Sequence, residues 1–96
     1  MNHTDQQQTV RILKALADDI RLNIVKHIAR QRGPIASCDV VTSCARYAQL
    51  SQPAMSHHFK KLVDAGVLLV EKQGTENHYS LNKKLCKQHG IDVGKL

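Results

Sequence analysis

The chain has 96 residues and a net charge of +6, from 14 Lys and Arg against 8 Asp and Glu. This length suffices for one domain around one core, and no apolar run reaches the roughly 18 residues of a membrane span. The charge indicates either a self-repelling, soluble surface or a polyanionic partner. Only 3% of the residues are aromatic, so the stacking platforms of single-strand binders are scarce and duplex DNA is the favoured polyanion.

The N-terminal eight residues lack the basic start and the apolar run of a secretory signal peptide. The three cysteines form an odd set without such a signal, which favours free thiols in a reducing compartment. We therefore expect a cytoplasmic protein.

A capping-box pattern at residues 4–7 predicts a first helix over about residues 5–17. Two neighbouring apolar lines have helical spacing: Val10, Leu13 and Ala17 form one, and Ile12, Leu16 and Ile20 form the other. So broad a stripe is more than one neighbouring helix needs. It indicates deep burial in the core or, in our preferred interpretation, a second copy of the chain that covers part of this helix.

Asp18 and Asp19 supply a cap and favourable charge for a second helix over about residues 20–31. Its expected core positions are Ile24, Val25 and Ile28. The Gly-Pro pair that follows ends this helix.

A third helix, capped by Ser37 or Asp39, is predicted to run to about Tyr47. Only three residues then separate it from a fourth helix, which Ser51 caps and Gly66 ends. Two helices joined by so tight a turn are typical of a helix-turn-helix.

The fourth helix has two chemically different faces. Its core stripe consists of Met55, Phe59, Leu62 and Val63. The opposite side is short and basic, with Pro53, Ala54, His57, Lys60 and Lys61, and with Asp64 towards its end. Such a face suits a helix that enters a DNA groove. The adjacent His57 and His58 point about 100° apart on a helix, so one metal ion cannot easily bind both.

A β-hairpin is predicted after the fourth helix. Residues 67–70 are apolar, residues 78–81 alternate, and the polar stretch between them has Gly74 at its centre. A hairpin directly behind a groove-binding helix is called a wing. Its polar side chains serve either as ordinary turn residues or as contacts to phosphates and the minor groove: Lys72, Gln73, Thr75 and Asn77.

The tail contains Gly90 and Gly94, which disfavour a long helix, so we expect a turn or two over about residues 83–88. The predicted fold is mainly α with a small β-hairpin, a winged helix-turn-helix of four to five helices and a two-stranded wing. One domain spans residues 1–96. Its parts are a first helix (5–17) that favours dimerisation, a helix-turn-helix (37–65), a wing (67–81) and a short tail (82–96).

Three stretches of the chain resemble the ArsR-type winged helix-turn-helix repressors: Ala15–Val25, Leu50–Val67 and the hairpin up to Leu81. The resemblance covers about residues 9–82. It implies a homodimer that binds pseudo-palindromic operator DNA and represses transcription. In many members a metal, a metalloid or a thiol-reactive signal releases the DNA. Many members also close the dimer with a helix after the wing, which the short tail here can offer only in part.

Matched by position, the resemblance places Gln52, Ser56 and His57 in the DNA groove, and Lys60 with the wing residues on the DNA backbone. His57 is also the residue that lies nearly opposite the core stripe, whereas His58 lies on the flank and is expected to pack. The candidate DNA-binding set is Ser51, Gln52, Ala54, Ser56, His57, Lys60, Lys61, Lys72, Gln73 and Thr75.

The resemblance places the family's helix-three thiolate pair near Val40 and Thr42, where this chain has no cysteine. Its nearest cysteines are Cys38 and Cys44, whose spacing matches neither the family's pair nor a zinc knuckle.

Cys86 and His89 form a second spaced pair, which needs His78 or another subunit to hold a metal. Three interpretations follow: incidental thiols with Cys44 as a small core residue, a thiol or redox sensor, or a metal or metalloid site. We favour the first, and so expect no cofactor. The weak metal candidates are Cys38, Cys44, Cys86 and His89.

The leading hypothesis is a sequence-specific, duplex-DNA-binding transcriptional repressor that acts as a homodimer. The alternative is a winged-helix module that binds protein and not DNA. No enzyme is expected, because the chain has no Gly-rich phosphate loop, no paired carboxylates in an apolar setting and no nucleophile motif.

Overall fold

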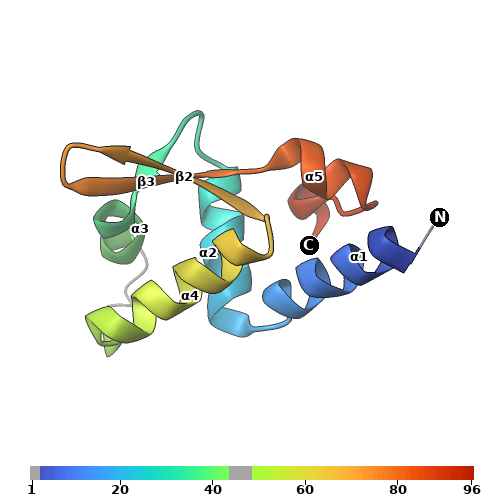
Figure 1. The fold of residues 1–96 in the computed structure, drawn as a ribbon. Coiled ribbons are helices and arrows are strands. Elements are labelled where there is room, and N and C mark those ends of the chain that lie inside the picture. Colours follow the sequence, from blue (N-terminus) through green and yellow to red (C-terminus); the bar gives the residue numbers. More distant parts are fainter. Residues whose placement is uncertain (1–2, 44–48) are drawn as a thin grey trace.

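The computed structural model describes residues 3–43 and 49–96. Within these ranges the chain forms the helices α1 (His3–Leu16), α2 (Asp19–Ala29), α3 (Ser37–Ser43), α4 (Gln52–Asp64) and α5 (Lys83–Gln88). The strands are β1 (Ile35–Ala36), β2 (Leu68–Gln73) and β3 (Glu76–Leu81), and a 3₁₀ turn, η2 (Val93–Lys95), follows them (Figure 1). The predicted class, mainly α with a small sheet, is confirmed. The predicted end of the third helix, near Tyr47, lies outside the described residues, as does Cys44.

The caps read from the sequence organise α2 and α4. The Asp18 carboxylate accepts a hydrogen bond from the Arg21 backbone N–H at 2.9 Å, and Ser51 Oγ accepts one from the Ala54 N–H at 3.2 Å. Gly66 follows α4 with a φ of 85°, the left-handed conformation expected where the chain leaves a helix. A Cβ at this glycine would also lie 2.7 Å from a methyl group of Leu85.

Two helix bounds differ from the prediction. Helix α1 begins at His3, two residues before the expected start, which is within the usual fraying of a helix end. Helix α2 ends at Ala29 and not near residue 31. There the N–H groups of Arg30 and Gln31 bond to carbonyls three residues back, so the last turn tightens and the helix closes early.

The sheet has three antiparallel strands in the order β1-β3-β2. The predicted two-stranded wing is confirmed as β2 and β3, and β1 adds a third strand that the sequence did not predict. Ile35 pairs with Tyr79 across β1 and β3. A strand of two residues is too short to show an alternating pattern, and it forms only because β3 offers an edge. The hairpin strands are also longer than predicted, and Gln73 pairs with Glu76 across a two-residue turn that Gly74 begins with a φ of 66°.

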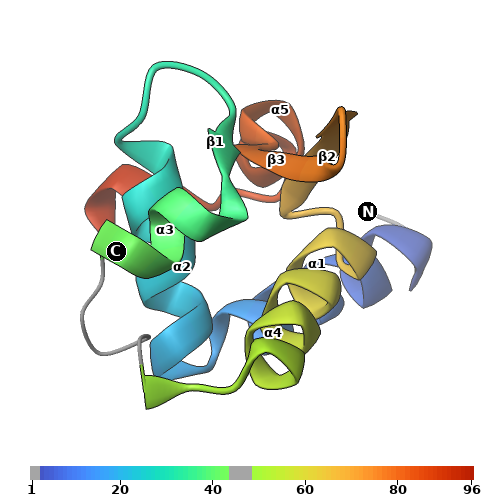
Figure 2. The same ribbon diagram turned by 90° about the vertical axis from the view of Figure 1, so that its left-hand side faces the viewer.

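The core lies where α1, α2, α3 and α4 meet the base of the sheet (Figure 2). Its fully buried members are Ile12, Ile24, Val25, Val40, Leu62, Val67 and Leu68. The Phe59 ring stacks on Tyr79 at a centroid distance of 4.4 Å, which fixes α4 against the wing. Among the described residues, no helix has the length and apolar character needed to cross a membrane.

The two apolar lines of α1 have different surroundings. Ile12 and Leu16 are buried, whereas Val10 is 40% exposed, Leu13 is 51% exposed and Ala17 is exposed. The interpretation that the core of one chain buries the whole apolar stripe is therefore wrong. One apolar line of α1 faces solvent.

Candidate nucleic-acid interface

The outer face of α4 is free of the core. Met55, Phe59 and Leu62 are buried on the inner side of the helix, and Val63 is half-buried. The predicted groove-facing and backbone-facing side chains of this helix are all exposed: Gln52, Ser56, His57, Lys60 and Lys61. Ala54 is half-buried and Ser51 is exposed at the cap. Helix α4 therefore presents a polar, basic surface of about three turns.

The two histidines of α4 are in different environments. His57 is exposed, whereas His58 packs between α4 and the start of α2. Its Nδ1 lies 3.4 Å from Nη1 of Arg21 and 3.9 Å from Oδ2 of Asp18. Burial lowers the pKa of His58, the Asp18 charge opposes this shift, and the Arg21 charge adds to it. The expectation that His58 packs is confirmed, and its surroundings favour the neutral imidazole.

Two of the candidate side chains on α4 already have partners. Lys60 Nζ lies 2.9 Å from Oδ2 of Asp64, one helical turn away, and both side chains are mostly exposed. Such an exposed pair contributes little, so a phosphate can displace the carboxylate at low cost. The Ser51 oxygen accepts the cap hydrogen bond, which leaves its O–H as a donor.

The wing extends beside α4, and its polar side chains Lys72, Gln73, Thr75 and Asn77 are exposed. Gln73 bonds to Glu71 on its own strand at 3.4 Å, and Thr75 lies in the turn. A cavity of about 310 Å³ between wing and helix brings Asn77 together with Ser56 and Lys60. Asn77, which the sequence could place only in the wing, thus lies next to the groove-facing side of α4.

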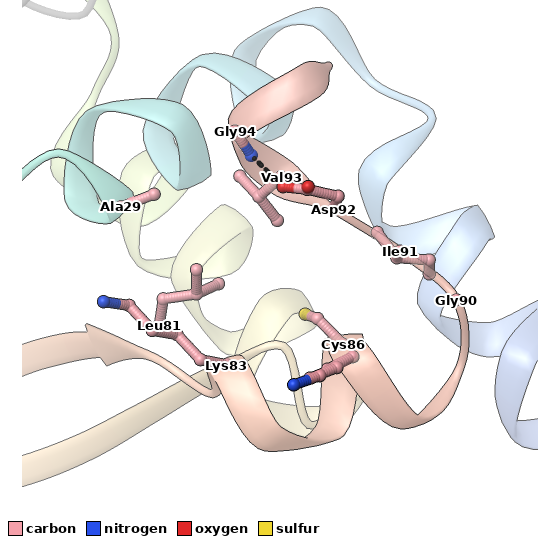
Figure 3. Close-up of a pocket in the computed structure, with 10 residues that line it drawn as sticks. Ala29, Leu81, Lys83, Cys86, Gly90, Ile91, Asp92, Val93 and Gly94 are labelled. Carbon is pink, nitrogen blue, oxygen red and sulfur yellow. Dashed lines mark hydrogen bonds between the residues drawn. The ribbon is translucent and has the colours of Figure 1, made fainter.

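The described cysteines lie in separate places. Cys38 is exposed on α3, and Cys86 is buried on α5. The Cys86 thiol lies at an apolar cavity of about 530 Å³ between α2, β3 and the tail (Figure 3), and burial raises its pKa. Burial and the raised pKa both disfavour the reactive thiolate form of Cys86.

The metal candidates are not drawn together in the part of the chain that the structure describes. His89 Nδ1 is 2.6 Å from the Thr9 hydroxyl, and His78 lies in the wing beside Glu76. No three His, Cys, Asp or Glu side chains gather there in a geometry that could hold a metal ion. The thiol and metal interpretations stay predictions.

Comparisons with known proteins agree with this geometry. Residues 18–71 match the sequence family described as "Bacterial regulatory protein, arsR family". The arsenical resistance operon repressor of Staphylococcus aureus is 38% identical over 71 residues, which are 74% of this chain and 62% of that protein. The chain thus spans less than two thirds of this relative's length.

Two solved structures are similar in fold. The ArsR-like transcriptional regulator from Rhodococcus sp. RHA1 has a TM-score of 0.73 and 19% identity, covering 88% of this chain and 74% of that one. A homodimeric winged helix-turn-helix DNA-binding domain from Mycobacterium bovis has a TM-score of 0.69 and 22% identity, with the same coverage. The matched family is one of regulatory proteins, the class that the sequence predicts. The chain belongs to the arsR family of bacterial regulatory proteins.

Proposed function

We propose that this chain is a cytoplasmic transcriptional repressor that binds duplex DNA as a homodimer. One observation carries the proposal: the outer face of α4 is polar, basic and, apart from the half-buried Ala54, exposed, while its inner face is buried in the core. An α-helix fits the major groove of B-DNA, and its exposed side chains can then reach base edges. The repressor role of the Staphylococcus aureus relative supports this assignment.

In the proposed complex, bases and backbone are contacted by different residues. Gln52, Ser56 and His57 are exposed, offer hydrogen-bonding groups and would read base edges. Lys60 and Lys61 beside them, with Lys72 on the wing, would contact phosphates and supply the salt-dependent part of the affinity. Gln73 and Thr75, at the end of the wing, would reach the adjacent backbone or minor groove.

The exposed apolar line of α1 supports the homodimer. Val10 and Leu13 on α1, with Ala17 just beyond its end, are exposed apolar side chains, which two copies can bury against each other about a two-fold axis. The homodimeric state of the Mycobacterium bovis domain supports the same arrangement. Two copies of α4 would then meet two half-sites about one helical turn apart, roughly 10 base pairs or a multiple of that.

If the protein responds to a thiol-reactive signal, the surroundings of the two described thiols favour Cys38 over Cys86 as the sensor. Cys38 is accessible to a thiol-reactive signal, whereas burial raises the pKa of Cys86 and shields its sulfur. No metal forms part of this proposal.

The test selects duplexes from random DNA with the purified protein and then measures binding by fluorescence anisotropy and mass by light scattering. We expect a selected site with two related halves, and a dimer. Leu13→Asp should give a monomer that binds one half-site weakly. Leu96→Asp is the matched control, since Leu96 is exposed to the same extent as Leu13 but does not belong to α1. If micromolar protein binds no duplex at low salt, the protein-binding alternative replaces the proposal.

A further inference from the structure

A basic crevice lies on the side of α4 that faces α1. It has a volume of about 270 Å³ and forms between α1, the start of α2 and the C-terminal half of α4. Its charged lining consists of Arg11, Lys14, Arg21, Lys61 and Asp64. Four cations therefore surround one carboxylate.

Arg21 is the fixed charge of this crevice. Its side chain is only 13% exposed, and its Nε donates to the Ala15 carbonyl oxygen at 2.7 Å. A second nitrogen lies 3.9 Å from Asp18. The combined field also acts on His58, since the charges of Arg21 and Lys61 both lower the pKa of this neighbouring imidazole.

The other three cations of the crevice are exposed on its rim. Arg11, Lys14 and Lys61 are exposed, and none of the ion pairs between described residues includes them. The carboxylate of Asp64 already lies 2.9 Å from Lys60, so its charge is offset from outside the crevice. An anion that enters thus meets the held guanidinium of Arg21 and three exposed donors.

The crevice and the wing lie on opposite flanks of α4. On a helix, Lys61 is one turn beyond His57 and turned by about 40° from it, whereas Lys60 and Ser56 turn the other way, towards the wing. The cavities agree, because Lys61 and Ala65 line the crevice while Ser56 and Lys60 line the groove to the wing. Figure 1 also shows α1 and the hairpin on different sides of α4.

We propose that this crevice is a phosphate-binding site. Arg11 can present a planar fork to two phosphate oxygens, and Lys14 and Lys61 add point charges around Arg21. Two sources can supply the same group. One is a backbone phosphate of the DNA strand that borders the groove occupied by α4, which rests on the proposed function. The other is a free phosphorylated small molecule.

The DNA arm of the test uses the double variant Arg11→Gln/Lys14→Gln, because neither residue belongs to the reading face. Salt titrations with the selected and a scrambled duplex should show the slope of log affinity against log salt reduced by about 1 to 2 for both. If the slope is lower by 1, the loss of affinity between 50 and 200 mM salt is about fourfold smaller for the variant than for the parent protein. Lys84→Gln/Lys95→Gln removes the same charge outside the crevice and should leave the slope unchanged. Light scattering must show the same oligomeric state for all variants.

The small-molecule arm titrates inorganic pyrophosphate into ¹⁵N-labelled protein without DNA, against chloride at equal ionic strength. Saturable amide shifts around residues 11–21 and 61–65 that disappear in the double variant assign the site to a free phosphate ligand. A reduced slope without such saturation assigns it to DNA. An unchanged slope together with no saturation, or with saturation that persists in the variant, overturns the site. If the parent protein binds no DNA, the proposed function fails and the pyrophosphate arm alone decides the crevice.

Discussion

Helices α1 and α4 differ in their outer faces although they resemble each other in length and packing. They have 14 and 13 residues, and each packs one apolar stripe into the same core. The outer face of α4 is polar and basic, whereas that of α1 includes the exposed Val10 and Leu13. The buried stripe fixes each helix in the fold, and the outer face determines which partner it suits. A basic face suits a polyanion, and an exposed apolar line suits a second copy of the chain.

The largest expected effect is on folding stability, and it distinguishes the buried faces of α4 and α1 from their exposed faces. Leu62→Ala should lower the free energy of unfolding by about 2–5 kcal/mol, because Leu62 is fully buried and its truncation leaves a cavity. Leu13→Ala should change the stability of the monomer by less than about 0.5 kcal/mol. Urea unfolding of dilute protein measures both. Equal losses would mean that the outer line of α1 belongs to the core after all.

The next effect distinguishes the two histidines of α4, because one variant should change DNA affinity and the other should change stability. His57→Ala should cost about 1–3 kcal/mol in a specific DNA complex and relax the preference at one base position, without loss of stability. His58→Ala should destabilise the fold and leave the base preference intact, since His58 packs against Arg21 and Asp18. Anisotropy with single-base operator variants checks both changes. A His57 variant that distinguishes operator from scrambled DNA as well as the parent does would remove this residue from the reading face.

The contact between α4 and the start of α2 should respond to pH, because His58 lies there beside Arg21 and Asp18. Burial lowers the pKa of His58, so the unfolded chain binds its proton first and stability falls as the pH drops below about 6.5. The backbone hydrogen bond from Arg21 lowers the pKa of Asp18, so its stabilisation is present above about pH 4 and is lost only as the pH falls through the lower folded value. Unfolding from pH 7.5 to 5 should thus be less pH-dependent in His58→Gln than in the parent. Identical pH profiles would contradict the buried, neutral imidazole.

The smallest effect concerns the outer face alone. Lys60→Ala should weaken binding to all duplexes alike and reduce the salt slope by about 1. Asp64→Ala should strengthen binding to all duplexes at low salt, because it releases Lys60 from its ion pair. Both should change stability little, since the pair is exposed. Salt titrations with selected and scrambled DNA make the comparison. A slope that does not change in Lys60→Ala would show that Lys60 contacts no phosphate.

Most of α4 could be predicted from the sequence because its signals are local. The Ser51 cap, the buried stripe and the stop at Gly66 each act within one or two turns. The polar composition of the opposite face follows from the same periodicity. The hairpin was predictable for a similar reason, although its strands proved longer, because a Gly at a two-residue turn sets the register of both strands.

Three features depended on contacts between distant parts of the chain. Strand β1 exists because Ile35 meets Tyr79, and two residues are too few to show a period. Periodicity showed both apolar lines of α1, but only the packing of α2 and α4 decided that Ile12 is buried and Leu13 exposed. The crevice required Arg11, Arg21 and Lys61 to converge from three helices. A local pattern fixes which side chains share a face, whereas tertiary packing determines what each face meets.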